Sequence, residues 1–199
     1  METGSALAAF ALIALATAVT CLVRLHQLAP EVAPARDAVS DYGAGPHAGW
    51  YRTQVVSVGL AAAAIGLGLR AAGLGAGGVV WLYLFAAARV LIAGFPVDLP
   101  GSERTRTGVA HNLLATTAFA SIAVAASTIS ADLVGDPTWR FDGSWFQWLG
   151  SLVVLAAVAL AAAWVVPGLR RSAFGAVERC WYAATIAWLG LSAIGLLLS

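Results

Sequence analysis

Long apolar runs separated by short polar stretches extend along the whole chain. The runs are continuously apolar and do not alternate between apolar and polar positions, so they predict helices and not the strands of a membrane barrel. Each is close to the roughly 20 helical residues needed to cross a bilayer core of about 30 Å. We predict six such helices, at about residues 5–24, 51–72, 77–95, 108–130, 145–167 and 178–198.

Composition supports this assignment. Of the 199 residues, 60% are hydrophobic and 11% are charged, and the mean hydropathy is +0.84, far outside the range of soluble domains. We therefore expect an all-α fold: a polytopic integral membrane bundle of six transmembrane helices, forming a single domain over residues 1–199 without a soluble domain. Any chemistry then lies within the bundle or in its loops.

The distribution of arginines predicts how the bundle is oriented. Eight arginines belong to the first, third and fifth loops and the adjoining helix ends: Arg24, Arg36, Arg52, Arg104, Arg106, Arg170, Arg171 and Arg179. Two, Arg70 and Arg140, belong to the other face. The excess of positive charge found on cytoplasmic loops predicts a multi-pass cell-membrane protein with these three loops inside and both termini outside.

One further arginine lies within an apolar run. Arg89 precedes Pro96 by seven residues, which places it about 10 Å below the helix end at about 1.5 Å per residue. A charge at that depth either faces the bundle interior and a partner or extends its side chain toward the membrane surface. We expect the partner, where there is one, to be Asp41, Asp98 or Glu178.

Three polar elements carry a resemblance to a known family. They are "VSDYGAG" before the second helix, "GFPVDLPG" closing the third and "RTRTGVAHN" opening the fourth. In this order they resemble the bacterial and archaeal membrane family catalogued as domain of unknown function 998, over essentially the whole chain. The resemblance implies six helices but no activity. The positions that match its pattern are Ser40, Asp41, Gly43, Phe95, Pro96, Asp98, Gly108 and His111.

The residue types at this end of the bundle suit acid–base chemistry. Asp41, Asp98 and His111 are the candidate catalytic residues, because a carboxylate can orient a histidine for proton transfer. The candidate substrate-binding residues are Arg89, Arg52, Gln54, Asn112 and Glu178. We expect Asp41, Asp98 and His111 to lie within about 10 Å of one another around a cavity into which Arg89 points. The competing interpretation is a charged loop that only connects helices.

Other kinds of site find less support. A zinc site from His26, His47 and His111 would lack the spacing of a compact ligand motif, and we expect no metal and no cofactor. The chain has no G-x-S-x-G element and no phosphate-binding or dinucleotide-binding fingerprint, and nothing in it favours nucleic-acid binding. Cys21 and Cys180 are interpreted as free packing residues.

Three functions remain open on the sequence. The preferred one is a polar pocket at the cytoplasmic leaflet that binds, or acts by acid–base chemistry on, a lipid-like or amphiphilic small molecule. The alternatives are a small transporter working as a dimer and a non-catalytic structural or accessory subunit. Membrane lipids are the expected partners, and the small residues Gly59, Ala63 and Gly66 are compatible either with close packing inside the bundle or with a homodimer interface.

Overall fold

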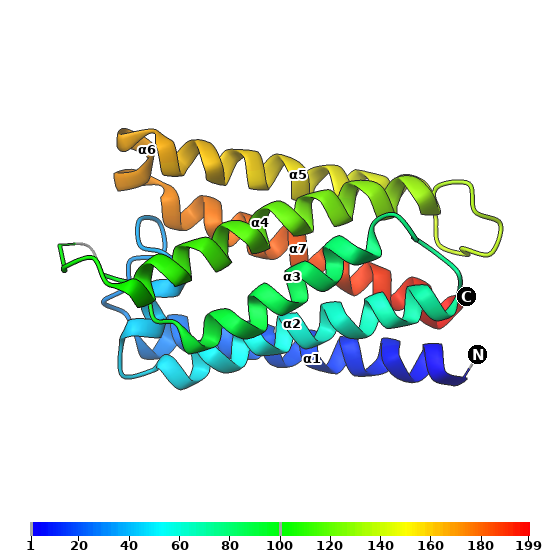
Figure 1. Ribbon diagram of the computed structural model, residues 1–199, viewed down its shortest axis with the longest axis horizontal. Helices are drawn as coiled ribbons and strands as arrows, with labels where there is room; N and C mark the ends of the chain where they lie inside the picture. The colour runs from blue at the N-terminus through cyan, green and yellow to red at the C-terminus, as the bar shows by residue number, and fades with distance from the viewer. Residues whose placement is uncertain (1, 100) are drawn as a thin grey trace.

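The computed structural model describes residues 2–99 and 101–199, and every regular element in them is helical. The long helices lie roughly side by side along one axis (Figure 1). Both termini lie at one end of the bundle, together with the α2–α3 and α4–α5 connections. The opposite end carries the other three connections, which we call the loop end.

Five helices of the described chain are long and apolar enough to cross a membrane. The protein is therefore a helical, multi-pass membrane protein. These helices are α1 (Glu2–Leu28), α2 (Ala48–Ala71), α4 (Arg106–Leu133), α5 (Gly143–Val165) and α7 (Phe174–Leu198). The segment predicted as a third span is shorter: α3 (Val79–Leu91) and the 3-10 turn η2 (Ile92–Gly94) together make one apolar helix.

Local sequence explains the short third helix. It begins after a glycine-rich turn in which Gly73 and Gly75 adopt positive φ angles of 72° and 62°, a conformation that glycine tolerates best. It ends because Phe95, the residue before Pro96, is extended with φ −122° and ψ 97°. A proline disfavours helical geometry in the residue that precedes it.

Two further short elements belong to the loop end. The 3-10 helix η1 (Val39–Ala44) interrupts the long first loop, and α6 (Pro167–Ser172) separates α5 from α7. Pro167 opens α6, a position where its missing N–H costs nothing. The first loop also caps α7, since the backbone N–H groups of Gly175 and Ala176 donate to the carbonyls of Arg36 and Ala35 at 3.3 and 3.0 Å.

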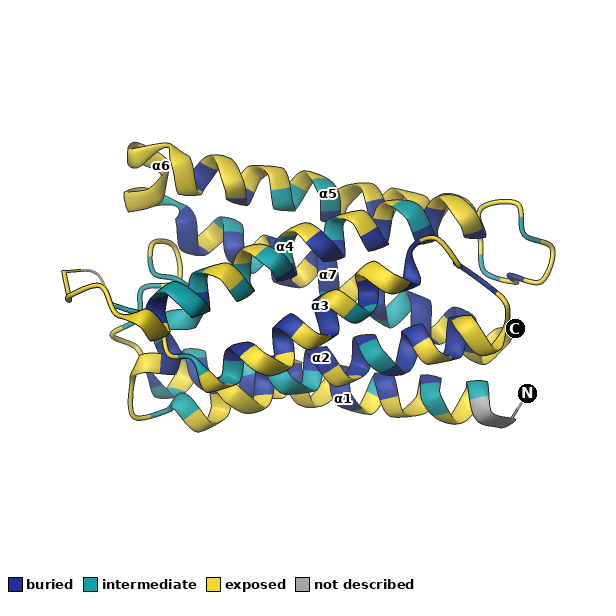
Figure 2. Ribbon diagram, viewed as in Figure 1, coloured by how far each residue is buried: buried dark blue, intermediate teal, exposed yellow. Residues whose placement is uncertain are grey.

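Burial divides the helices into central and peripheral ones. The inward faces of α2 and α7 are buried, whereas α5 is largely exposed along its length (Figure 2). In a bilayer this exposed surface would face lipid. The core consists mainly of alanine, leucine, isoleucine, valine and aromatic side chains, and a small set of polar side chains is buried among them.

Candidate functional site

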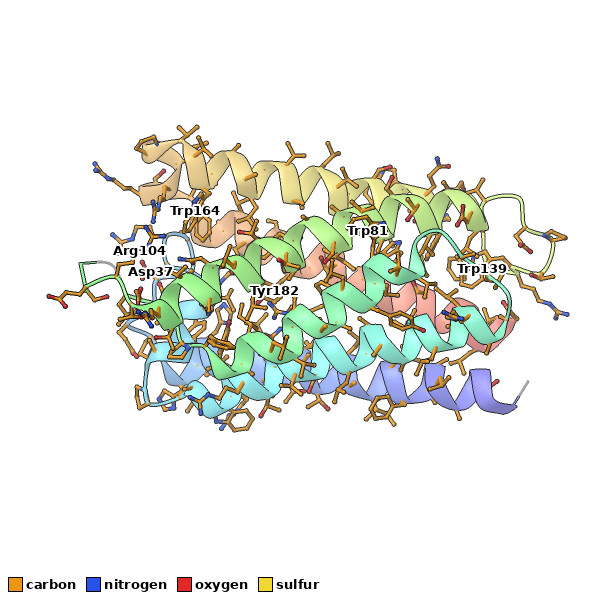
Figure 3. All side chains as sticks on the ribbon, in the orientation of Figure 1. Asp37, Trp81, Arg104, Trp139, Trp164 and Tyr182 are labelled. Atoms are coloured by element: carbon orange, nitrogen blue, oxygen red, sulfur yellow. The ribbon has the colours of Figure 1, made fainter. Side chains whose placement is uncertain are left out.

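Three helices bring polar side chains together inside the bundle, near the loop end. Gln54 comes from α2, Arg89 from α3 and Tyr182 from α7, and these side chains are 0%, 2% and 3% exposed. We call these three residues the Arg89 cluster. Figure 3 shows Tyr182 among the helices, whereas Arg104 and Asp37 lie at the loop end.

Arg89 is held by neutral groups. Its Nη2 donates to Gln54 Oε1 at 3.2 Å and to the hydroxyl of Tyr182 at 2.8 Å, and its guanidinium carbon lies 5.1 Å from the centre of the Tyr182 ring. The expected ion pair with a carboxylate is not what the structure shows. Glu178 is near enough to interact electrostatically but forms no hydrogen bond with Arg89 within the described chain. The side chain points into the bundle, so the alternative of reaching out to the membrane surface is wrong.

The donors of the cluster are only partly satisfied. Within the described chain, Arg89 Nε and Gln54 Nε2 are buried without a hydrogen-bond partner. The indole Nε1 of Trp181 and the hydroxyl of Thr185, on the same face of α7, are also buried and unpartnered. A buried donor without an acceptor typically costs about 1–3 kcal/mol. The Arg89 cluster and the adjoining face of α7 therefore contain buried polar groups that the described protein leaves unpaired.

Glu178 connects the Arg89 cluster to the first loop. Its carboxylate is buried and accepts a hydrogen bond from the backbone N–H of Val39 at 2.6 Å. It also interacts electrostatically with Asp41, Arg89 and Arg179. The first loop therefore covers this end of the bundle and supplies a backbone donor to the buried carboxylate.

Asp41 lies in this covering loop and is half-buried. Its carboxylate accepts from the backbone N–H of Ala38 at 3.2 Å, at the start of η1. Burial raises the pKa of Asp41 to about 6, and the nearby Asp37 adds to the rise; the Ala38 hydrogen bond and Arg179 oppose it. Asp41 is thus a carboxyl group that titrates close to neutral pH.

Asp98 is held at the start of α4. Its carboxylate accepts from the hydroxyl of Thr105 at 2.6 Å and from the backbone N–H of Thr105 at 2.9 Å. These two bonds hold the pKa of Asp98 below its ordinary value. The carboxylate lies directly against Gly108, where a Cβ atom would overlap it. The aspartate of the second sequence element therefore packs on the glycine of the third.

His111 is buried in the second turn of α4. Its Nδ1 lies 2.7 Å from the carbonyl oxygen of Phe95. A carbonyl only accepts, so Nδ1 carries the proton and Nε2 is the basic nitrogen. His111 interacts electrostatically with both Arg89 and Asp98.

The predicted catalytic residues are thus held by different partners. In the described chain, Asp41, Asp98 and His111 form no hydrogen bond with one another. Asp98 and His111 belong to the start of α4, while Asp41 belongs to the cover formed by the first loop and Glu178. Arg89 interacts electrostatically both with His111 and with Glu178.

Of the other predicted binding residues, Gln54 is a direct partner of Arg89. Arg52 is exposed near the start of α2, and Asn112 is half-buried beside His111 on α4. The Arg89 cluster is packed, so entry of a ligand requires neighbouring side chains to move. Two hollows of the described surface, of about 360 and 490 Å³, lie at the other end, along α4 and α5.

Sequence reasoning missed two contributors. Tyr182 and Trp181 were not among the predicted site residues, but they are buried and lie against Arg89 and the aromatic core, respectively. Their spacing carried a usable signal: Glu178, Trp181, Tyr182 and Thr185 recur every three to four residues and share one helix face. The interaction of Arg179 with His26 crosses 153 residues of sequence and left no local signal.

Comparison with known proteins gives a family and no activity. No curated protein and no solved structure matches the chain. The profile of one family, described as protein of unknown function (DUF998), matches residues 7–195, which is nearly the whole chain. The resemblance seen in the three polar elements is thereby confirmed, and the chain belongs to the DUF998 family of membrane proteins.

Proposed function

We propose that the protein binds the anionic head group of a lipid-like amphiphile at the Arg89 cluster. One observation carries this proposal: a fully buried guanidinium whose hydrogen-bond partners in the described chain are both neutral. A buried charge without a directly bonded counter-charge is costly, and in membrane helices such a residue usually marks a functional site. An anionic ligand would supply a counter-charge that bonds the guanidinium directly.

The unpaired donors favour the same class of ligand. Arg89 Nε, Gln54 Nε2 and Trp181 Nε1 are all N–H donors, and a phosphate or carboxylate offers only acceptors. Charge-assisted hydrogen bonds of this kind are about twice as strong as neutral ones. The head group would therefore satisfy at once several donors that the protein leaves buried.

Aromatic side chains beside the cluster suit the apolar part of such a ligand. Trp181 stands edge-on to Phe119 of α4 and Phe85 of α3, with ring centres 4.6 and 6.5 Å apart. These three rings form an apolar wall next to a polar anchor, the combination that small-molecule sites usually present. The arginine distribution supports placing this site at the cytoplasmic leaflet.

Proton transfer at this site would fall to His111. Its Nδ1–H is engaged by Phe95, which leaves Nε2 as a base held in the bundle interior. Asp98 lies within electrostatic reach of the ring, and Asp41 titrates near neutral pH at the other edge of the site. This arrangement supports a second step, in which the protein carries out acid–base chemistry on the amphiphile after binding it.

A transporter is the second candidate, and one observation favours it. Buried polar groups continue from the Arg89 cluster along α7 toward the other end, at Thr185, Trp188 and Ser192. The indole of Trp188 donates a hydrogen bond to Ser130 of α4 at 3.0 Å. A one-sided binding site does not require such a series. Movement of the amphiphile between leaflets would use it.

Binding to two lipids that differ only in their head group tests the proposal. The purified protein in detergent micelles is titrated with a short-chain phosphatidic acid and with the diacylglycerol carrying the same chains, and tryptophan fluorescence is followed. We expect the phosphatidic acid to bind and the diacylglycerol to bind far more weakly. Arg89→Gln should weaken phosphatidic acid binding by about 100-fold, since truncating one member of a buried charged pair costs about 2–5 kcal/mol.

Arg104→Gln is the matched control, because Arg104 is exposed in the connection before α4 and its replacement should change the affinity less than about threefold. Equal binding of the two lipids, or equal affinities of the two variants, would exclude a head-group site at Arg89. Flux of the phosphatidic acid across proteoliposomes, measured with the same proteins, separates transport from static binding.

A further inference from the structure

A polar hollow lies at the other end of the molecule, on the surface that faces lipid. It is a groove of about 360 Å³ between α4 and α5, lined by Ser127, Ser130, Gln147, Ser151, Val154 and Leu155. Its volume falls within the range of about 300–1,000 Å³ typical of small-molecule sites. It is separate from the Arg89 cluster, which lies near the loop end.

The polar side chain at the bottom of the groove is hydrogen-bonded to the protein, whereas the polar side chains along its sides are exposed. Ser130 is buried; its hydroxyl accepts from Trp188 at 3.0 Å and donates to the carbonyl of Phe146 at 3.4 Å. Ser127, Gln147 and Ser151 are exposed, and in the described residues their side chains form no hydrogen bond with the protein. In hydrocarbon, where water is scarce, such groups need partners from outside the chain.

The depth of the groove indicates which part of an amphiphile it would meet. Ser127 lies six residues before the end of α4, about 9 Å along the helix at about 1.5 Å per residue. Trp145 and Trp148, 63% and 59% exposed, stand on the first turns of α5 and mark the level of the membrane interface. The groove therefore begins just below the head groups, at the depth of ester carbonyls and lipid hydroxyls.

We propose that the α4–α5 groove is a second binding site, for the uncharged hydrogen-bonding group, a hydroxyl or an ester, of a membrane-dissolved amphiphile. Gln147 offers both a donor and an acceptor, and Ser127 and Ser151 offer hydroxyls that do either. The lining carries no charge, so an ionised group would be desolvated there without compensation. Val154 and Leu155 continue the groove as an apolar track for the chain of the ligand.

The shape of the surface favours a small molecule over a helix from a second copy. The polar groups lie along a concave hollow between two helices of one chain, and Ser130 at its floor is buried beneath the surface. A flat helix-on-helix contact would leave that hollow unfilled, and close packing is the main source of helix association in membranes.

Photolabelling in native-like membranes tests this site. Two probes are used: a long-chain alcohol with a diazirine near its hydroxyl, and a diacyl phospholipid with a diazirine in one acyl chain. We expect labelling concentrated in residues 127–131 and 147–155 that is suppressed by excess unlabelled competitor. Saturable labelling by the alcohol identifies a hydroxyl ligand and saturable labelling by the phospholipid identifies an ester; either supports the site.

The double variant Gln147→Leu with Ser151→Ala should lower this labelling about fivefold, as expected for two lost membrane hydrogen bonds. Thr17→Val is the matched control, because Thr17 is an exposed polar residue of α1 whose hydroxyl is already bonded to Ile13. Ser127→Ala, a smaller change, gives the same test if the double variant does not fold.

Two results would overturn the proposal. The first is unsaturable labelling spread over all lipid-facing helices and unchanged in the variants. The second is efficient disulfide-linked dimerisation of a Gln147→Cys chain whose native Cys21 and Cys180 are replaced by alanine, which would show that a second copy covers the groove.

Discussion

Two arginines near the loop end of the bundle differ in how many hydrogen bonds their guanidinium groups form. Arg179 of α7 donates to His26 Nε2 at 2.8 Å, to the Asp37 carbonyl at 2.9 Å, to the Gly175 carbonyl at 3.0 Å and to the Tyr42 hydroxyl at 3.4 Å. Arg89 of α3 is more deeply buried and yet donates to two neutral side chains through one nitrogen.

These hydrogen bonds give Arg179 a structural role, whereas Arg89 has fewer bonds to the protein. Arg179 joins α1, the first loop and α7. His26 accepts its bond because the other ring nitrogen donates to the Leu22 carbonyl. Gly175 allows this closeness, since a Cβ atom there would lie 2.7 Å from the Pro34 carbonyl oxygen. Arg89 joins helices too, but its Nε is buried without a hydrogen-bond partner in the described chain.

Binding should give the largest separation between the two arginines. We expect Arg89→Leu to weaken phosphatidic acid binding by about 100-fold and Arg179→Leu by less than about threefold, because only Arg89 presents unpaired donors to the site. Parallel titrations of both variants measure this. Equal losses would mean that both arginines act through the same folded region.

For the free energy of unfolding we expect the opposite order, with the larger loss in the Arg179 variant. We expect Arg179→Leu to lower the free energy of unfolding by about 2 kcal/mol, because it leaves acceptors on three segments without their donor. Arg89→Leu should cost about 1 kcal/mol or less, because the lost bonds to Gln54 and Tyr182 are offset by removal of a desolvated charge. Chemical unfolding in micelles gives both values, and Arg179→Lys should fall between the wild type and Arg179→Leu. A larger loss in Arg89→Leu would contradict the distinction.

The carboxyl group beside Arg179 should make stability depend on pH. The pKa of Asp41 is raised to about 6 in the folded protein, above its ordinary value of 3.8, so folding favours the protonated form. Its stabilising contribution is present below about pH 4 and is lost as the pH rises through 6. We expect a loss of about 1–2 kcal/mol over this interval, after allowance for its partial exposure.

Asp41→Asn should remove this dependence, so the difference in unfolding free energy between wild type and variant, measured from pH 4 to 7, isolates the contribution of Asp41. A difference that stays constant over this range would show that Asp41 keeps an ordinary pKa in the folded protein.

A small effect, on stability alone, should come from a residue that forms no hydrogen bond with either arginine in the described chain. The Thr105 hydroxyl caps α4 by accepting from the Gly108 backbone N–H at 3.0 Å and also donates to Asp98. Thr105→Val should lower stability by about 1 kcal/mol, a typical cost for losing a helix cap, without changing lipid affinity. A loss of affinity in this variant would indicate that Asp98 also contributes to lipid binding. The binding difference between Arg89 and Arg179 would then not define the whole site.

The positions of several candidate residues in the bundle were predictable from the sequence, but their hydrogen-bond partners were not. Arg89, Gln54, Glu178 and His111 were each expected near the loop end, and they are found there. The second and third polar elements contact each other, through Asp98 on Gly108 and His111 on Phe95. The sequence did not reveal that Asp98 would accept hydrogen bonds from Thr105, the residue that caps α4, or that both hydrogen-bond partners of Arg89 in the described chain would be neutral.

Hydropathy and residue type are properties of each segment taken alone, so the sequence by itself determined the membrane class, the helical content and the family. The length of the third helix also follows from local signals, since glycines precede it and Pro96 follows it. Pairing depends on how each helix is rotated about its axis and how far it is shifted along its neighbours. Only the tertiary structure decided that Tyr182, 93 residues from Arg89 in the chain, would bind it, and that Glu178 would turn instead to the backbone of the first loop.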